Sequence, residues 1–231
     1  MSYKSSEGNL DQLYVNDEWL ILQYAVSIWT CGYNAYSQLG DNSITDRSSP
    51  VQIGSSSWSA ISVGNSFTSA IRFKGSLFTW GFNNVGQLGL GDTTSRSSPV
   101  QVGSSSWTVS SAGNNFTQAI TSAGLLFAWG NNANGILGLP LVAYTPQDSN
   151  FTNSSWASIS SANNFTAGIR TDGSLWMWGV NTYGQLGQNN VTTRSSPVQV
   201  GSSSWTMVSA GMQHTTAIRV DGTLWAWGRN N

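Results

Sequence analysis

With 231 residues, the chain can form one all-β domain or two small domains. Only 8% of its residues are charged and the formal net charge is −1, which excludes a basic surface that would attract phosphates. No apolar run is long enough to span a membrane, and residues 1–19 lack the apolar core of a signal peptide. We therefore expect no nucleic-acid partner and no membrane insertion.

Residues 1–18 differ in composition from the rest of the chain. They carry five charges, whereas the other 213 residues (231 − 18) carry 14 (19 − 5). We predict that they form an N-terminal arm or docking segment, and that residues 19–231 form a series of repeats. The candidate partner contacts of this arm are its apolar anchors, Tyr3, Leu10, Leu13 and Tyr14. The alternative is a terminus without fixed structure, as is common at domain ends.

The first repeat is degenerate. Ile21–Tyr24 and Ile28–Cys31 align with two consecutive segments of the last repeat, Ala217–Val220 and Leu224–Trp227. We therefore expect an N-terminal β-hairpin ahead of the complete units. Cys31 occupies the position of a tryptophan in later repeats, so we interpret it as a buried structural thiol rather than a nucleophile.

A pattern of the form LFTWG or LWAWG recurs every 49 residues along the rest of the chain. Self-similarity at such a period indicates a repeat architecture. The copies are Ile28–Gly32, Leu77–Gly81, Leu126–Gly130, Leu175–Gly179 and Leu224–Gly228.

Each repeat contains the signals of about four short strands. Gly and Asn in the loop before them tolerate positive φ, and Asp221-Gly222 is a hairpin turn signal. In the last repeat, the expected strands are Val198–Val200, Met207–Ala210, Thr215–Val220 and Leu224–Trp227.

The tryptophan-containing strand is apolar at successive positions, so both of its faces must be covered. Four-stranded sheets that stack face to face around an axis provide this cover, which predicts an all-β fold of the β-propeller type. A β-helix is the rival, but its rungs are shorter. We expect more than about 40% strand and burial of Trp129, Trp178 and Trp227 between adjacent sheets.

The unit NxxGQLG…RSSPVQVG…SWxxVSAG…TxAIRxDGxLWxWG resembles the regulator of chromosome condensation repeat, and we expect a bacterial or phage type. In the fourth unit it spans Asn181–Gly187, Arg194–Gly201, Trp205–Gly211 and Thr215–Gly228. The resemblance implies a β-propeller, seven-bladed in the best-known members. Those members include an exchange factor for a nuclear GTPase, a β-lactamase inhibitor, ubiquitin-ligase modules and a plant photoreceptor, so the fold alone does not give the function.

The third unit departs from this pattern in one loop. Leu139, Leu141, Val142 and Tyr144 replace polar residues of the sister loops. We interpret these four residues as candidate partner contacts. The alternative is that this loop packs on the neighbouring blade.

The sequence offers no catalytic, cofactor or metal site. It contains one His and one Cys, which cannot form a His cluster or a thiolate zinc site. His214 stands where the other units have Phe, and we interpret it as a structural hydrogen-bonding residue. We therefore predict a protein that is not an enzyme and that uses no cofactor.

Two functions remain. The favoured one is a structural component of a bacteriophage virion, such as a tail fibre, attached through the N-terminal arm and contacting other virion subunits, a host surface receptor or a glycan. The alternative is an extracellular or cytoplasmic protein-binding module of the inhibitor or adaptor type. Equal 49-residue steps leave no room for the projection of an exchange factor, and the loop tryptophans of the photoreceptor are absent.

The closure of the ring is a separate question, because four whole periods follow Gly32 and the sequence stops inside a repeat. We favour four full units plus the hairpin as an incomplete part of a seven-bladed ring. The alternatives are a closed ring of four or five blades and cover by another subunit. Packing of Leu224–Trp227 against Ile21–Cys31 would indicate a closed ring.

Overall fold

The computed structural model describes residues 26–139, 143–148 and 155–230 in full, together with the backbone of three short strands that precede them. Strands make up 53% of the chain, which confirms the predicted all-β class. Within the described residues, the one helical element is a short 3₁₀ turn, η1 (Ala133–Gly135).

The strands follow the 49-residue period of the sequence. The first five are β1 (Tyr3–Ser5), β2 (Asp11–Val15), β3 (Glu18–Leu22), β4 (Ile28–Gly32) and β5 (Arg47–Ile53). The next two groups are β6 (Trp58–Val63), β7 (Phe67–Arg72), β8 (Leu77–Gly81) and β9 (Arg96–Gln101), then β10 (Trp107–Ala112), β11 (Phe116–Thr121), β12 (Leu126–Gly130) and β13 (Ala143–Asp148). The last are β14 (Trp156–Ser161), β15 (Phe165–Arg170), β16 (Ser174–Gly179), β17 (Arg194–Ala210), β18 (His214–Arg219) and β19 (Leu224–Gly228).

Each complete blade is an antiparallel sheet of four strands in chain order, such as β6-β7-β8-β9. The long strand β17 serves two blades, because its first part pairs with β16 and its second part pairs with β18. The VQV segments therefore pair with the tryptophan strand before them. The blade boundary thus falls after this segment, and not before it as our grouping of strands within the sequence unit implied.

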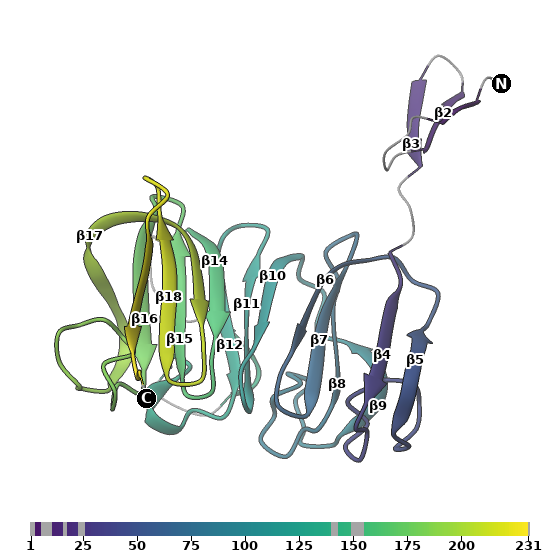
Figure 1. Cartoon of the computed structure of the whole chain (residues 1–231). Coiled ribbons are helices and arrows are strands. Elements are labelled where there is room, and N and C mark those ends of the chain that lie inside the picture. Colours follow the sequence, from purple (N-terminus) through teal and green to yellow (C-terminus); the bar gives the residue numbers. More distant parts are fainter. Residues whose placement is uncertain are drawn as a thin grey trace.

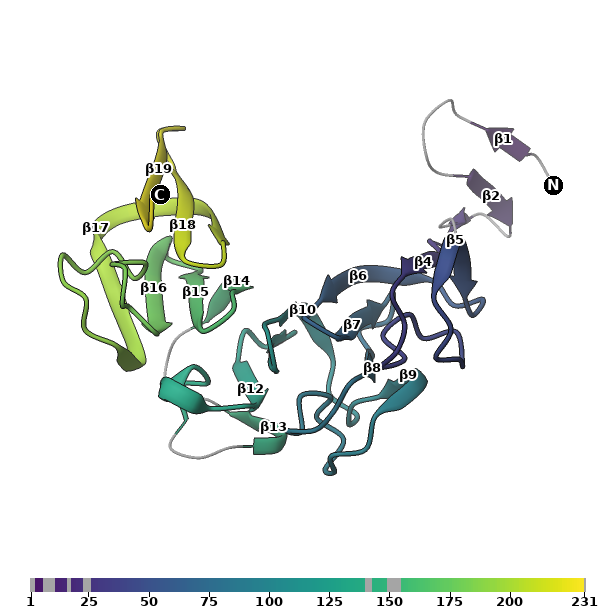
Figure 2. The same ribbon diagram turned by 60° about the horizontal axis from the view of Figure 1, so that its bottom comes forward.

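The sheets stand side by side in an arc (Figures 1 and 2). Seen from the end in Figure 2, the first sheet (β4 and β5) and the last strands (β18 and β19) lie at opposite ends of this arc. Leu224 is 70% exposed and Trp225 is 44% exposed, so the last strand is not covered by the first sheet. The described sheets do not close into a ring.

A repeated pair of hydrogen bonds joins neighbouring blades. The indole Nε1 of Trp129 donates to the carbonyl oxygen of Gln87 at 3.0 Å, and the hydroxyl of Thr117 donates to the same oxygen at 2.8 Å. Trp80 and Thr68 bind the carbonyl of Gln38 in the same way. Each acceptor lies in the GQLG-type loop of the preceding blade, so this loop is fixed to the next sheet.

The tryptophan prediction is confirmed at Trp129 and Trp178, which are fully buried, but Trp227 is only partly buried. Trp227 still donates to the carbonyl of Gln185 at 2.9 Å. Its sheet is the last of the arc, and within the described residues no further sheet covers its outer face. Position in the repeat therefore determines the hydrogen bond, whereas position in the arc determines the burial.

One expectation for the start of the chain is wrong in the structure. Cys31 is exposed rather than buried, because the described residues contain no preceding loop that covers it as Gln38 covers Trp80. On β3, Ile21 and Leu22 pair with β2. The expected pairing of Ile21–Tyr24 with Ile28–Cys31 is not among the described strand pairs, and residues 23–25 lie outside the described residues, so this hairpin stays a prediction.

We predict that Trp129→Phe destabilises the fold more than Trp227→Phe. Both variants remove the same indole donor, but the Gln87 carbonyl is in a dry seam and the last sheet is open to water. The loss at Trp129 is expected to be about 1–3 kcal/mol. Urea unfolding followed by circular dichroism measures both, and equal losses would contradict this account of the seam.

Candidate protein-binding face

The long loops that follow β4, β8, β12 and β16 all emerge at the same end of the sheets. We call this end the loop face. The short turns between the two inner strands of each blade, such as the turn between β6 and β7, lie at the same end. The loop face thus combines four long loops with four inner turns.

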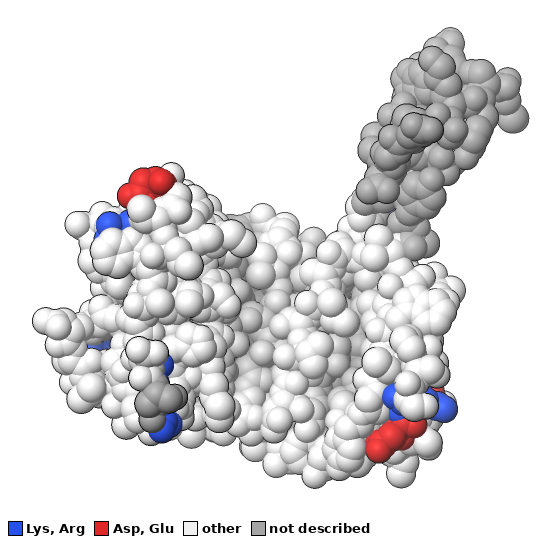
Figure 3. All heavy atoms as spheres, viewed as in Figure 1, with Lys and Arg blue, Asp and Glu red and all other residues white. Residues whose placement is uncertain are grey.

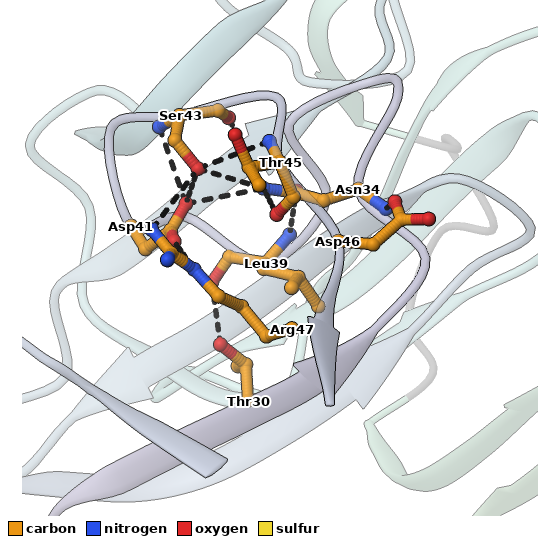
Figure 4. Close-up of polar contacts among 8 residues, drawn as sticks. All are labelled: Thr30, Asn34, Leu39, Asp41, Ser43, Thr45, Asp46 and Arg47. Carbon is orange, nitrogen blue, oxygen red and sulfur yellow. Dashed lines mark hydrogen bonds and ion pairs between the residues drawn. The ribbon is translucent and has the colours of Figure 1, made fainter. Parts of the chain in front are cut away.

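An asparagine organises each long loop from within, buried in three of the four loops and partly buried at Asn132. In the first loop, the Asn34 side chain donates to the carbonyl oxygens of Ser43 and Thr45, both at 3.1 Å, and accepts from the backbone N–H of Leu39 at 3.0 Å (Figure 4). The hydroxyl of Thr30, on β4, donates to the Leu39 carbonyl and ties the loop to the sheet. Such bonds hold a turn-rich segment in one conformation.

The same bond recurs in each later repeat. The side chains of Asn83, Asn132 and Asn181 accept from the backbone N–H of the leucine five residues on, at distances of 2.9–3.0 Å. Asn83 and Asn181 are fully buried. The recurring Asn of the sequence is therefore an internal brace of the loop and is not available to a partner.

Arg47 and Asp41 close the first loop at its surface. The Arg47 Nε lies 2.6 Å from the Asp41 carboxylate, whose side chain is 3% exposed (Figure 4). Burial raises the pKa of Asp41, but hydrogen bonds from Ser43 and Arg47 and the charge of Arg47 outweigh it and hold the pKa below its ordinary 3.8. Arg96 and Asp92 repeat this ion pair in the next blade.

A shallow depression of about 340 Å³ lies between the inner turns on the loop face. Its lining comes from the same three positions of each repeat, and none of the lining residues is charged. The lining residues are Val63–Asn65, Ala112–Asn114, Ser161–Asn163 and Ala210–Met212.

Exposed tyrosines stand on the long loops. Tyr33 is 59% exposed, Tyr36 is 43% exposed and Tyr183 is 43% exposed. The Tyr36 ring packs on Phe82 of the next loop, with ring centroids 4.6 Å apart. The Arg229 guanidinium lies 4.8 Å from the centre of the Tyr183 ring. These rings are held in position by neighbours while one side remains in water.

The apolar loop of the third unit also packs on the fold. Leu139 is partly buried against the core of its blade, and its carbonyl accepts a bond from the Asn132 side chain. Tyr144 is 49% exposed, and its carbonyl accepts from the N–H of Gly91 in the preceding blade at 2.9 Å. Leu141 and Val142 lie outside the described residues.

The other predicted contact residues belong to the N-terminal segment. Tyr3 is on β1, and Leu13 and Tyr14 are on β2, where the structure describes the backbone alone. Leu10 lies outside the described residues. The partner role of all eight candidate residues stays a prediction.

The tyrosines and the depression were missed by sequence reasoning. The loops were recognised as turns. Tyr36 and Tyr183 occupy the same position of the repeat, but Val85 and Asn134 stand there in the two units between them, so the recurrence is incomplete. In the described ranges, no group of three or more His, Cys, Asp or Glu side chains is placed to hold a metal ion. His214, in the slot of the buried phenylalanines, is exposed on the last sheet.

A family model for the regulator of chromosome condensation (RCC1) repeat matches residues 27–71, 74–120, 123–169 and 172–218. A second RCC1 repeat model matches residues 156–185 and 206–231. The chain belongs to the RCC1 repeat family. No curated protein sequence matches it significantly.

Among solved structures, human WBSCR16 shares 21% identity at a TM-score of 0.78, covering 92% of this chain and 59% of that one. Prp20p of Saccharomyces cerevisiae, described with its binding to Gsp1p and histones, shares 21% identity at a TM-score of 0.78 over 92% of this chain and 55% of its own. Yeast RCC1 (Prp20) bound by Kap60 gives 16% identity, 91% and 67% coverage and a TM-score of 0.55. These likenesses show the fold, and this chain spans less than two thirds of the first two structures.

In the described part of the chain, no helix is long and apolar enough to cross a membrane.

The lowered pKa of Asp41 makes stability depend on acid. Because the pKa in the folded state lies below the ordinary 3.8, the contribution is present above pH 3.8 and is lost as pH falls through the lowered value. We expect Asp41→Asn to destabilise the protein at pH 7 and to do so much less near pH 2.5. Unfolding free energies at the two pH values measure this. Asp221→Asn is the comparison for a carboxylate on an exposed turn, where hydrogen bonds from Thr223 lower the pKa and no ion pair with an arginine is described. An Asp41→Asn difference that is independent of pH would contradict it.

Substitution of two glycines at the same position of the repeat can distinguish the cost of backbone strain from the cost of a steric clash. Gly86 and Gly184 have φ of +80° and +76°, but a Cβ at Gly86 would overlap Tyr144, whereas a Cβ at Gly184 meets nothing within 4 Å. We expect Gly184→Ala to cost about 1 kcal/mol and Gly86→Ala to cost more. Thermal unfolding of both variants checks this, and equal costs would argue against tight packing of Tyr144.

Proposed function

We propose that this chain is a non-enzymatic protein-binding propeller module that engages its partner through the loop face. The observation that carries the proposal is the set of exposed tyrosines on loops braced by buried asparagines. Binding surfaces are more precise when their supporting residues are already locked. The loop face has this property, because each loop is fixed both to its own sheet and to the next.

The chemistry of the loop face favours a protein over a charged ligand. A tyrosine ring offers a large apolar area and a hydroxyl, and aromatic residues are enriched at protein interfaces. The depression has no charged lining residue. On the face of the molecule in Figure 3, charged atoms lie in a few separate small patches and most of the surface is uncharged.

The comparisons support protein binding as a class of function. Prp20p is described with Gsp1p and histones, and yeast RCC1 with Kap60. Because the identities are only 16–21% and this chain spans only part of those proteins, we do not assign those partners to it. The lack of an enzymatic site stays a prediction.

A narrower proposal concerns the setting of this function. A bacteriophage virion component, attached through the N-terminal segment, fits the low charge of the chain and the apolar residues ahead of the repeats, including Tyr3 and Leu10. In that setting the loop face would contact another virion subunit, a host receptor or a glycan. Mass spectrometry of purified particles tests this, because a protein absent from particles of its host's phages is not a virion component.

The loop-face proposal predicts that Tyr36→Ala together with Tyr183→Ala weakens partner capture at least about tenfold, as expected for interface anchors worth more than 1 kcal/mol each. The matched control is Phe73→Ala. Phe73 is 56% exposed and lies in the turn between β7 and β8, at the opposite end of the sheets. Crosslinking in host extract with quantitative mass spectrometry identifies the partner and measures the loss. Equal capture by the tyrosine variant and the wild type would overturn the proposal.

A further inference from the structure

The first sheet of the arc has an incomplete set of strands. Among the strand pairs that the structure describes, β4 pairs with β5 alone, whereas the equivalent strand β8 pairs with both β7 and β9. Trp29 on β4 is 58% exposed, and its equivalent Phe78 is 7% exposed. The edge of β4 that would pair with an inner strand is therefore open, and β4 carries the exposed ring of Trp29.

A cavity of about 290 Å³ lies beside this open edge. It is lined by Val26–Trp29, at the start of β4, and by Trp58–Ile61, on the inner strand of the next blade. In a complete blade this place belongs to the two inner strands. The cavity thus has the position of a missing hairpin.

One core position of the second seam corresponds to a residue of β3 in the first. In the second seam, Ile71 and Leu77 pack with Trp107 of the following blade. In the first seam, the equivalents of Leu77 and Trp107 are Ile28 and Trp58, which are both buried in one cluster. The equivalent of Ile71 is Leu22, at the end of β3, where the structure describes the backbone alone.

The β2–β3 hairpin has the register of an inner hairpin. Its pairs Asp11↔Leu22, Gln12↔Ile21, Leu13↔Leu20 and Tyr14↔Trp19 become, 49 residues later, Ala60↔Ile71, Ile61↔Ala70, Ser62↔Ser69 and Val63↔Thr68. The latter four are the observed pairs of β6 and β7. Since a shift of one residue would turn every side chain to the other face, a match of all four pairs is a strong constraint.

We propose that the β2–β3 hairpin docks on the free edge of β4 and completes the first blade. The blade then has the order β2-β3-β4-β5, equivalent to β6-β7-β8-β9. The register of β7 and β8 predicts the new pairs Leu22↔Ile28, Ile21↔Trp29, Leu20↔Thr30 and Trp19↔Cys31. The occupant of the cavity is thus a segment of this chain.

At equivalent positions, the first seam has apolar side chains where the second seam has polar ones, and this difference supports docking of the hairpin. In the second seam, the Ser69 hydroxyl bonds the Ser110 hydroxyl at 3.2 Å. The equivalents in the first seam are Leu20 and Ile61, so an apolar pair replaces a polar pair. Ile61 is 50% exposed in the described structure, and docking of β3 would give it an apolar neighbour.

A second pair of equivalent positions also changes from polar to apolar. In the second seam, the Ser62 hydroxyl accepts from the backbone N–H of Ala112 at 2.9 Å. The equivalents in the first seam are Leu13 and Val63. Val63 is 68% exposed, whereas Ala112 is 7% exposed. Two separate positions on the next blade are therefore apolar and open where the hairpin offers leucine.

Docking of the β2–β3 hairpin would place the boundary between arm and repeats earlier in the chain. Leu13 and Tyr14 would belong to the first blade instead of the attachment segment, which would then end near Leu10. Tyr3 and Leu10 would remain candidates for contact with a partner.

The test uses Cys31, the one cysteine of the chain. In the proposed register Trp19 is directly opposite Cys31, at a Cα separation of about 5.5 Å, which permits a disulfide. Trp19→Cys should therefore form an internal disulfide with Cys31 under mild oxidation, seen as a monomer with linked peptides. Leu20→Cys, which projects to the other face of the strand, is the matched control and should not. A folded Trp19→Cys variant without the link, or a disulfide-linked dimer, would overturn the proposal.

Hydrogen exchange of the unaltered chain gives a second measurement that needs no substitution. Docking predicts that amides of Glu18–Leu22 and Ile28–Gly32 exchange together and at least about tenfold more slowly than those of Tyr3–Ser5. Rapid exchange of Glu18–Leu22 alongside protected β6 and β7 would show that the hairpin does not dock.

Discussion

The blades depend on one carbonyl oxygen per seam. The oxygen of Gln87 accepts from the indole of Trp129 and from the hydroxyl of Thr117, both on the next blade. An acceptor buried without partners would cost about 1–3 kcal/mol, so each loop is constrained to the position where both donors reach it. The equivalent loops around Gln38 and Gln185 carry the exposed tyrosines. The constraint that stacks the sheets therefore also places the candidate binding face.

The third seam keeps the carbonyl acceptor and the indole donor but changes the second donor. Here the acceptor is the carbonyl of Ile136 instead of a glutamine, and a backbone oxygen does not depend on the side chain that carries it. Trp178 donates to this oxygen at 2.9 Å, and the second donor is the Gln118 amide at 3.1 Å. A different residue type on a different strand thus supplies the second bond, which explains how a divergent repeat keeps the same spacing.

The 49-residue period was sufficient to predict the strands, the buried Trp129 and Trp178 and the turn positions, because each depends on contacts that every repeat shares. It could not predict the exposure of Cys31 or the partial exposure of Trp227, because those depend on whether a neighbouring sheet covers the slot. The bond from Gly91 to Tyr144 was hidden for another reason. Its equivalent in the first seam joins Asn42 to Ser97, so Tyr144 stands two residues off the period. A shift of this kind in a divergent loop leaves no trace in the repeat pattern.

The arc also explains why a binding face can be built from separate repeats. Each blade contacts its neighbours, so the stability of such an array is approximately a sum of unit and seam terms. Tyr36 and Tyr183 come from loops 147 residues apart in the chain (183 − 36), and their spacing is set by the three seams between them. The affinity of a partner that contacts both rings would depend on the geometry of those seams as well as on the rings themselves. A substitution such as Trp129→Phe, far from the tyrosines, would then weaken binding by allowing the spacing of the loops to vary.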